Sequence, residues 1–365
     1  MPLTLDDLRR FAVTRSLFQP TTLERALDTL GFVQADPIRA PARAQDLTLR
    51  HRVKGYRAGD LERRYEALGI EEDFFVNYGF VTRAVYELMH PRGGPVSKSV
   101  TRSKRVEALL SFVKAQGTAH PRQVDDHFDH GSVTNYWGGS SSATTHLLTD
   151  MHYRGLLRVV RRDVGIRVYG VREAMQPPAD KASREARLDA LVDVVVRKYA
   201  PLPAASLWGL VRRLRYAVPQ WERGLAPALK RAKQRLPHAH VDGIEWYWPA
   251  GETIEAGAAP EIVRLLAPFD PVVWDRRRFE ILWGWAYRFE AYTPVKKRER
   301  GYYALPLLWR DRVVGWGNVT VRDGALTSDF GYVSGRRPSD RQFRQALDAE
   351  IEKLRAFLDL GSPSS

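Results

Sequence analysis

Apolar residues recur at helical spacing over residues 3–30. Leu5, Leu8 and Phe11 would share one face of a first helix, and Gly31 can end a second helix. A short apolar run follows, which predicts a strand. Further helices are predicted at residues 42–54 and 59–68, and an apolar, strand-like piece at 73–81. Helix, helix, short strand and helix is an order with which a winged-helix unit can begin.

A second set of helical patterns starts near Thr101. Apolar residues from Val106 to Val113 predict a helix that Gly117 ends, and residues 120–128 predict a shorter one. The set continues with a polar loop at residues 131–139, a third helix capped by Ser140 to Ser142, and two strands around a turn at 163–165. Three helices and a hairpin predict a winged helix, whose third helix commonly enters the DNA major groove. Winged helices also pack against proteins, so a purely structural unit is the alternative.

Residues 183–248 repeat this architecture without repeating its sequence. They predict three helices and the start of a wing, and similar patterns recur roughly ninety residues apart along the chain. Proline- and glycine-rich stretches at residues 91–95, 176–178 and 249–251 separate the repeats. We therefore expect three tandem units of one architecture.

The pattern changes after residue 251. Apolar and polar residues alternate and aromatic residues are frequent, which predicts a small β-domain, barrel-like in form. A last helix opens at Pro338, and its apolar stripe from Phe343 to Leu358 should pack on that domain. The predicted fold is thus α+β, with three tandem winged-helix units, a small C-terminal β-barrel-like domain and a terminal helix. The predicted domains span residues 1–92, 100–175, 180–250 and 258–365.

The charge balance favours a polyanionic partner. Lys and Arg number 57 against 43 Asp and Glu, which gives a formal net charge of +14 and a pI near 10.0. Cysteine is absent, so disulfides, thiolate metal sites and a cysteine nucleophile are excluded. The chain shows no long apolar run and no signal-peptide pattern at its start. We expect a cytoplasmic, nucleoid-associated protein that does not enter membranes.

Gln34 and Asp36 are the strongest candidates for chemistry. They lie either side of Ala35, and Pro37 favours an extended conformation for Asp36. In an extended segment residues i and i+2 point to the same side, so an amide and a carboxylate would project together. The alternative is that Asp36 and Pro37 form an ordinary turn.

Cations and small polar residues supply candidates for DNA contact. The predicted DNA-binding residues are Arg43, Arg50, Arg52 and Lys54 after the Gln-x-Asp pair, Thr144 and Thr145 in the second unit's third helix, Arg161 and Arg162 in its hairpin, and Lys296, Lys297, Arg298, Arg300 and Tyr302 in the C-terminal domain. Cations beside aromatic rings suit phosphate contact with base stacking. A solvated loop is the alternative for residues 296–300.

Several cofactor motifs are missing. The sequence contains no phosphate-binding Gly-x-x-x-x-Gly-Lys-Ser/Thr loop, no His-Glu-x-x-His and no Gly-x-Ser-x-Gly. Its nine histidines show no paired spacing of a metal site; His120, His127 and His130 come nearest. We expect neither a metal nor a nucleotide cofactor.

Two segments resemble the crosslink-repair DNA glycosylase family, the YcaQ-like and AlkZ-like alkylpurine glycosylases. The first is Gln34-Ala35-Asp36, followed by Arg43, Leu47-Thr48-Leu49 and Arg52. The second, AYTPVKKRERGYYALPLLWRDRVVGWGNV, is similar to the family's C-terminal segment at Tyr292, Pro294, Lys297-Arg298, Gly301-Tyr302-Tyr303, Leu305-Pro306 and Val314-Gly315. Where many members have Trp-x-His-Glu-Ala, this chain has Tyr78 and no histidine.

The resemblance implies a monofunctional glycosylase with Gln34 and Asp36 as catalytic residues. Its partner would be double-stranded DNA carrying alkylated N3 or N7 purines, including interstrand crosslinks, held in a C-shaped arrangement of winged-helix units. No cofactor and a monomer are expected. The alternative is a non-catalytic winged-helix DNA-binding protein, such as a regulator or architectural factor. A protein-interaction scaffold is a third functional class, but such a protein would not need this excess of Lys and Arg over Asp and Glu.

Overall fold

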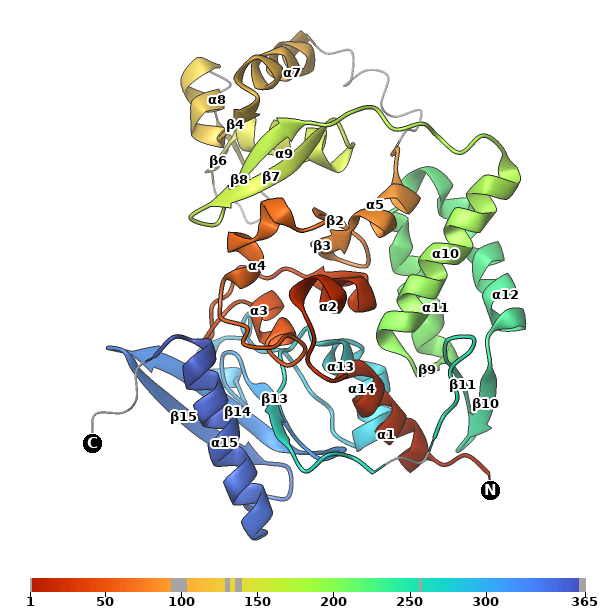
Figure 1. Ribbon diagram of the computed structural model, residues 1–365, viewed down its shortest axis with the longest axis vertical. Helices are drawn as coiled ribbons and strands as arrows, with labels where there is room; N and C mark the ends of the chain where they lie inside the picture. Colours follow the sequence, from red (N-terminus) through yellow and green to blue (C-terminus); the bar gives the residue numbers. More distant parts are fainter. Residues whose placement is uncertain (1, 93–103, 129–131, 135–139, 256–257, 361–365) are drawn as a thin grey trace. The chain divides into compact units, whose positions relative to one another are not determined.

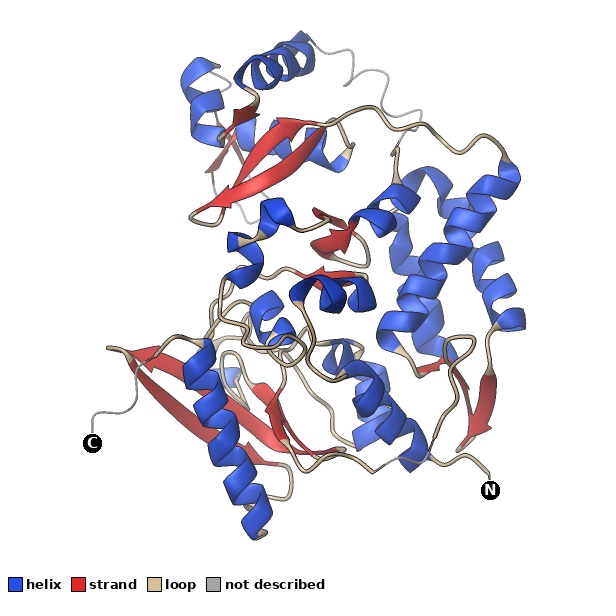
Figure 2. Ribbon diagram, viewed as in Figure 1, coloured by secondary structure: helices blue, strands red, loops and turns tan. Residues whose placement is uncertain are grey.

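The computed structural model describes residues 2–92, 104–128, 132–134, 140–255 and 258–360 (Figure 1). Its fold is mixed α+β, with small antiparallel sheets (Figure 2). The chain forms two compact units. Unit 1 comprises residues 1–61, 192–211 and 229–365, and unit 2 comprises residues 62–191 and 212–228. The four predicted domains remain a prediction, and the predicted linker at 93–95 lies outside the described residues.

The N-terminal part of unit 1 follows the predicted order of elements. Helix α1 (Leu5–Ser16) is capped by Thr4, and α2 (Leu23–Leu30) is capped by Thr22 and ended by Gly31 at φ 63°. Strand β1 (Phe32–Gln34) follows. Helix α3 (Ala44–Leu49) is shorter than the predicted 42–54, and Arg43 before it has an extended backbone with φ −68° and ψ 152°.

The rest of unit 1 adds a small hairpin sheet and a larger C-terminal sheet. The first contains β9 (Leu202–Pro203), β10 (His238–Val241) and β11 (Ile244–Tyr247). Between β9 and β10 in the sequence lie helices α11 (Ala204–Arg213) and α12 (Leu225–Arg235), each of which has residues in both units. The second contains β12 (Val263–Leu265), β13 (Leu305–Trp309), β14 (Arg312–Arg322) and β15 (Ala325–Tyr332) in that spatial order. As predicted, α15 (Arg341–Phe357) packs on this sheet: Phe343 lies edge-on to Trp309.

The barrel-like prediction for the C-terminal region is wrong in two respects. Among the described residues the four strands form an open sheet, with β12 and β15 at its edges. Residues 271–283, expected as part of the β-domain, form helices α13 (Pro271–Trp274) and α14 (Arg276–Trp283). The side chains of Asp270 and Asp275 cap these helices by accepting hydrogen bonds from Val272 N–H and Arg278 N–H. Capping by two aspartates, with Pro271 in the first turn, overrides the alternating pattern.

Unit 2 begins within α4 (Asp60–Arg63) and continues through η1 (Tyr65–Ala67) to the hairpin β2 (Ile70–Phe74) and β3 (Tyr78–Thr82) and helix α5 (Arg83–Met89). The single strand-like piece predicted at 73–81 is therefore a hairpin. The hydrophobic pattern did not indicate strand β2, because three of its consecutive residues are carboxylates. Glu71, Glu72 and Asp73 are nevertheless at most 2% exposed. Their nearest cations are Arg158 and Arg172 for Glu71, Arg162 for Glu72, and Arg92 for Asp73, which also lies 2.7 Å from the His90 ring nitrogen Nε2.

The second predicted winged-helix region has the three expected helices and the final hairpin, and adds the short strands β4, β5 and β6, which were not predicted. It contains α7 (Lys104–Gln116), β4 (Thr118–Ala119), α8 (Pro121–His127), β5 (Ser132–Thr134), β6 (Ser140–Ser142), α9 (Ala143–Tyr153), β7 (Leu157–Asp163) and β8 (Ile166–Val171). Leu109, Val124, Leu148 and Val159 share one apolar core. Residues 131 and 135–139 of the predicted polar loop lie outside the described residues.

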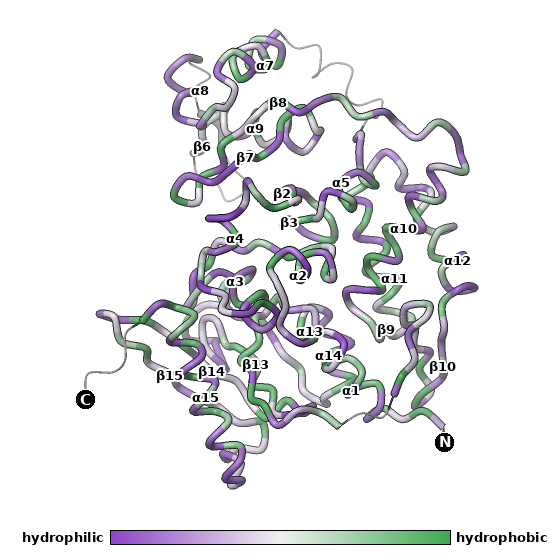
Figure 3. The backbone as a smooth tube through the Cα atoms, viewed as in Figure 1, coloured by the Kyte–Doolittle hydropathy of each residue, from purple (hydrophilic) through white to green (hydrophobic). Residues whose placement is uncertain are grey.

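Helix α10 (Lys181–Tyr199) passes from unit 2 into unit 1. Its tube alternates between hydrophobic and hydrophilic stretches (Figure 3). Two 3-10 helices, η3 (Leu214–Tyr216) and η4 (Pro219–Gly224), precede α12. The described helices include none long and apolar enough to span a membrane.

A buried ion pair joins three distant segments of unit 1. Arg52 and Asp270 are both 0% exposed, and the guanidinium donates to both carboxylate oxygens at 2.8 and 3.0 Å. Arg52 also donates to the carbonyls of Ser16 and Thr48. Because Asp270 caps α13 as well, this pair fixes where α13 begins relative to α1 and α3.

Lys198 anchors strand β1 from α10. Its amine donates to the Phe32 carbonyl, and the side chain is 3% exposed. Burial, with the nearby Arg52 guanidinium second, lowers the pKa of Lys198 to about 7, against a smaller opposing effect of Asp270. The strand that ends in Gln34 is therefore tied to a helix more than 160 residues further along the chain.

Removing Arg52 should destabilise the protein strongly. Arg52→Met leaves the buried carboxylate of Asp270 without its cation, which should lower the free energy of unfolding by about 3–5 kcal/mol. The matched control is Arg57→Met, whose pair with Asp359 is 62% and 75% exposed; it should cost at most about 1 kcal/mol. Urea unfolding measures both. Equal effects of the two substitutions would contradict the structural role of Arg52.

The buried Lys198 should make stability depend on pH in alkaline solution. Its pKa falls from 10.5 to about 7 on folding, so between these values the unfolded chain binds more protons. The free energy of unfolding must then rise with pH across this window, by about 1.4 kcal/mol per pH unit at most. The difference between wild type and Lys198→Met, measured by urea unfolding from about pH 7 to about pH 10, should grow accordingly. Exposed Lys230→Met is the matched control. A constant difference for Lys198→Met, or the same trend for both variants, would refute the assignment.

Candidate active site

Gln34 ends strand β1 and is held by an aromatic partner from the C-terminal part of unit 1. Its side-chain oxygen accepts a 2.6 Å hydrogen bond from the Trp274 indole N–H, and the residue is 6% exposed. Because the oxygen is engaged, the amide nitrogen is the group that can donate to a ligand.

Asp36 is a buried carboxylate two residues further on. It is 8% exposed, its Oδ1 accepts from the Ile38 N–H at 2.8 Å, and its own N–H donates to Gln45 at 3.2 Å. Burial raises the pKa of Asp36, and the Ile38 hydrogen bond opposes this only in part. A carboxylate destabilised in its charged form is a better proton acceptor than a solvated one.

Tyr303 places a neutral hydroxyl near Asp36. Burial and then the charge of the Asp36 carboxylate raise the pKa of Tyr303, so the phenol stays protonated. Its oxygen is buried and has no hydrogen-bond partner among the described residues. The ring packs edge-on against Phe289 at 5.2 Å. The hydroxyl therefore has hydrogen-bonding capacity that no described residue uses.

Trp274 is fixed by its surroundings rather than by Gln34 alone. It stands at the end of α13, the helix capped by Asp270, and its ring lies 5.3 Å from that of Tyr199. Buried Arg278 donates to the carbonyls of Tyr199 and Pro271 and so joins the ends of α10 and α13. The sequence offered no signal for the Gln34–Trp274 contact, because the two residues are 240 positions apart.

A loop at residues 292–302, which we call the 292–302 loop, carries all five DNA-binding residues predicted in the C-terminal domain. Lys296 and Lys297 are exposed, as are Tyr292 (73%) and Tyr302 (45%). The guanidinium of Arg298 lies 5.1 Å from the centroid of the Tyr302 ring. The loop thus presents cations and aromatic rings together, and contact with DNA stays a prediction.

The base of this loop is held by one buried carboxylate. Glu290 accepts hydrogen bonds from the backbone N–H groups of Glu299, Arg300 and Gly301 at 2.9–3.2 Å. Gly301 has φ 122°, and a Cβ there would lie 2.2 Å from the Asn318 side chain, so glycine is required. The loop leads directly into Tyr303.

The other predicted DNA-binding residues differ in how far their side chains are exposed to solvent. Lys54 and Thr145 are exposed, Arg161 pairs with Asp163 at 40% exposure, and Arg43 is half-buried. Arg300 is 14% exposed and lies between Glu290 and the Trp285 ring.

Four of the predicted DNA-binding residues are corrected by the structure. Arg52 is buried against Asp270, Arg50 is 4% exposed and paired with Glu350, Arg162 is paired with Glu72, and Thr144 is 0% exposed. A charge already neutralised in the interior is not available to a phosphate. Tyr78, at the position where the family pattern departs, donates to the same Glu72 at 2.7 Å.

The described residues contain no group of three His, Asp or Glu side chains that could hold a metal ion. The candidate site is instead an amide, a carboxylate with a raised pKa, an indole and a neutral phenol, all from unit 1.

Comparison with known proteins agrees with the sequence resemblance. The family model described as "DNA glycosylase AlkZ-like" matches residues 27–357, which include Gln34, Asp36, Trp274 and Tyr303. The fold is similar to that of Streptomyces sahachiroi DNA glycosylase AlkZ, with a TM-score of 0.62 and 14% identity over 98% of this chain and 97% of that one. The chain belongs to the AlkZ-like DNA glycosylase family.

Proposed function

We propose that this protein is a monofunctional DNA glycosylase that hydrolyses the N-glycosidic bond of N3- and N7-alkylated purines, with Asp36 and Gln34 as its catalytic residues. The observation that carries this proposal is the buried Asp36 carboxylate with its raised pKa, two residues from an amide held by Trp274. Membership of the AlkZ-like family supports it.

Hydrolysis of the glycosidic bond of an alkylated purine requires few catalytic groups beyond Asp36 and Gln34. An alkylated N7 purine carries positive charge and leaves readily, and the sugar passes through an oxocarbenium-like state. The C1′–N9 bond breaks with its electron pair going to the purine, and a water oxygen bonds to C1′. The Asp36 carboxylate takes the water's proton and stabilises the positive sugar electrostatically. No lysine nucleophile is required.

The neighbouring groups have definite roles in this scheme. With its oxygen held by Trp274, the Gln34 amide can donate a hydrogen bond to the attacking water and so help to direct the other lone pair of that water toward C1′. The neutral Tyr303 hydroxyl lacks a partner among the described residues and can donate to the same water or to the nucleotide. Both are positioning roles.

We further propose that the 292–302 loop contacts the DNA backbone and stacks against exposed bases. Exposed Lys296, Lys297, Tyr292 and Tyr302 support this proposal. The helix–helix–helix–hairpin order of residues 104–171 supports tandem winged-helix units as the DNA-binding framework. Tolerance of bulky adducts and of interstrand crosslinks belongs to the same proposal, as does action as a monomer.

Replacing Asp36 separates catalysis from binding. Asp36→Asn keeps the shape but removes the base and the negative charge, which should lower the excision rate on the order of 10²–10⁴-fold. Binding to undamaged duplex should stay equal or tighten slightly, because one negative charge near phosphates is lost. Gln34→Ala should be milder, and exposed Asp348→Asn should match wild type. The measurement is single-turnover release of alkylpurine from a modified duplex.

Two outcomes of this experiment would count against the proposal. Wild-type excision by Asp36→Asn would remove Asp36 from the mechanism. A wild-type protein that binds DNA yet excises none of a panel of alkylpurines would make the non-catalytic regulator the better description.

The excision rate should also report the titration of Asp36. Since only the carboxylate acts as base and burial raises its pKa, the rate should fall as the pH drops through a value above the ordinary 3.8. The residual rate of Asp36→Asn should lack this acidic limb. A pH–rate profile of both proteins on one modified duplex checks it; an identical limb in the variant would assign the titration to another group.

Salt dependence tests the 292–302 loop. If Lys296 and Lys297 each neutralise a phosphate, replacing both by Met should reduce the slope of log affinity against log salt by about 1.8. The matched control, Arg322→Met with Arg344→Met, removes two exposed charges elsewhere in unit 1 and should leave the slope closer to wild type. Fluorescence anisotropy with an undamaged duplex measures it, and equal slopes for both double variants would contradict loop contact.

A further inference from the structure

Unit 1 contains a cavity of about 740 Å³ that the proposed chemistry does not use. It is lined by the end of α1 and the segment after it, the residues that follow α3, strand β12 and helix α15. Its volume falls within the range typical of small-molecule sites. Gln34, Asp36, Trp274 and Tyr303 are not among its lining residues.

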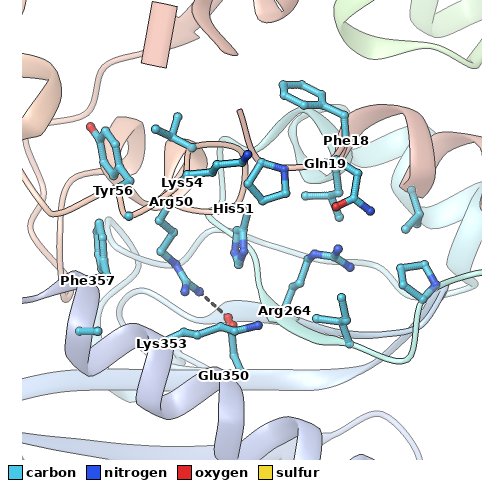
Figure 4. Close-up of a pocket in the computed structure, with 18 of the residues that line it drawn as sticks. Phe18, Gln19, Arg50, His51, Lys54, Tyr56, Arg264, Glu350, Lys353 and Phe357 are labelled. Carbon is cyan, nitrogen blue, oxygen red and sulfur yellow. Dashed lines mark hydrogen bonds and ion pairs between the residues drawn. The ribbon is translucent and has the colours of Figure 1, made fainter. Parts of the chain in front are cut away.

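The polar lining of the cavity is strongly cationic. Arg50 and Lys54 approach from the segment that follows α3, Arg264 from β12 and Lys353 from α15, while Glu350 is the single carboxylate of the lining. Figure 4 shows these side chains directed into one space from separate elements. Cations from several elements that converge on one space favour an anionic ligand.

Glu350 is already committed to other partners. It accepts a 2.5 Å hydrogen bond from the Arg50 guanidinium and a 2.8 Å bond from the Leu265 N–H, and is 2% exposed. Among the lining residues, the negative charge of Glu350 therefore offsets the positive charge of Arg50. The charges of Lys54, Arg264 and Lys353 have no carboxylate partner within hydrogen-bonding distance among the described residues.

Arg264 is the clearest sign of a missing ligand. Its Nη1 is buried and has no hydrogen-bond partner among the described residues. Burial lowers the pKa of Arg264, with Arg52 adding to the effect and Glu350 and Asp270 opposing it. A buried donor left without an acceptor destabilises the protein. Arg264 also lines the cavity, so its guanidinium can donate to an anion bound there.

His51 adds a neutral acceptor to these cations. Its Nε2 lies 2.9 Å from the Leu265 carbonyl, which fixes the proton on Nε2 and leaves Nδ1 able to accept. Burial, and then Arg50, lowers the pKa of His51, so the ring stays uncharged. A neutral acceptor beside donors suits a ligand that carries hydroxyl groups as well as negative charge.

The remainder of the lining is apolar and aromatic. Val13, Leu17 and Ile262 contribute aliphatic surface, and Tyr56 stacks on Phe357 with ring centroids 6.3 Å apart. The cavity therefore offers apolar and aromatic surface as well as cations, which matches a ligand with an anionic end and a flat or apolar body.

We propose that this cavity binds a phosphate group attached to a nucleotide-sized body, with Arg264, Lys54 and Lys353 contacting the phosphate. The phosphate can come from a free nucleotide or from the DNA backbone. The site is separate from Asp36, so Asp36→Asn should leave phosphate binding unchanged even if the proposed catalysis fails.

Calorimetric titration of the full chain with inorganic phosphate and with deoxyguanosine monophosphate tests the site. Wild type should bind the nucleotide saturably at millimolar concentration or below, and Lys54→Met with Lys353→Met should weaken binding at least tenfold. Arg264→Met should do the same, with circular dichroism used to check its fold. The control Arg322→Met with Arg344→Met removes the same charge elsewhere and should bind as wild type does.

A competition arm distinguishes the two phosphate sources. If undamaged duplex displaces the nucleotide, the site takes a DNA phosphate; if both bind together, it takes a free nucleotide. Either result supports the phosphate site. The absence of saturable binding by wild type, or equal weakening in the cavity and control double variants, would overturn it.

Discussion

The buried pair between Arg52 and Asp270 is the constraint on which unit 1 depends. Two full charges at 0% exposure are stable only when geometry is good and every remaining polar atom is satisfied. Here the guanidinium meets both carboxylate oxygens and two backbone carbonyls. The pair therefore specifies one relative placement of residues near 16, 52 and 270, three points far apart in sequence.

This placement also fixes the positions of the side chains in the candidate site. Asp270 caps α13, α13 ends in Trp274, and Trp274 holds the oxygen of Gln34. Lys198 fixes the other end of β1 through the Phe32 carbonyl. Because strand β1 is held at Phe32 and the Gln34 side chain is held by Trp274, the Gln34 amide has a defined position before any ligand binds, as the proposed catalysis requires. The buried charges thus act on function through geometry rather than by direct contact.

Local sequence signals predicted the helices well, because caps and apolar spacing act over a few residues. Thr22 and Gly31 bound α2, and Ser142 caps α9 as expected. The same reasoning selected Gln34 and Asp36, although which residues would surround them was not visible. Trp274 reaches Gln34 across 240 positions, and no periodicity encodes such a contact.

Charge was the least reliable guide. Arg50, Arg52 and Arg162 look like surface cations in the sequence, yet each is paired inside the protein. Strand β2 was missed for the opposite reason. Its consecutive carboxylates Glu71, Glu72 and Asp73 look exposed in the sequence, but they are buried because arginines from other elements neutralise them. Whether an arginine faces solvent or a carboxylate depends on tertiary partners, which a single sequence does not reveal.

The central claim is hydrolysis of the glycosidic bond by water that Asp36 activates, and the reaction products test it most directly. Wild type should be incubated with a duplex carrying one 7-methylguanine, with and without borohydride, and the mixture analysed by mass spectrometry. The account predicts free 7-methylguanine and an intact strand with one abasic site, without any protein–DNA adduct. A borohydride-trapped adduct, or a cleaved strand as the primary product, would show a lysine nucleophile and contradict it.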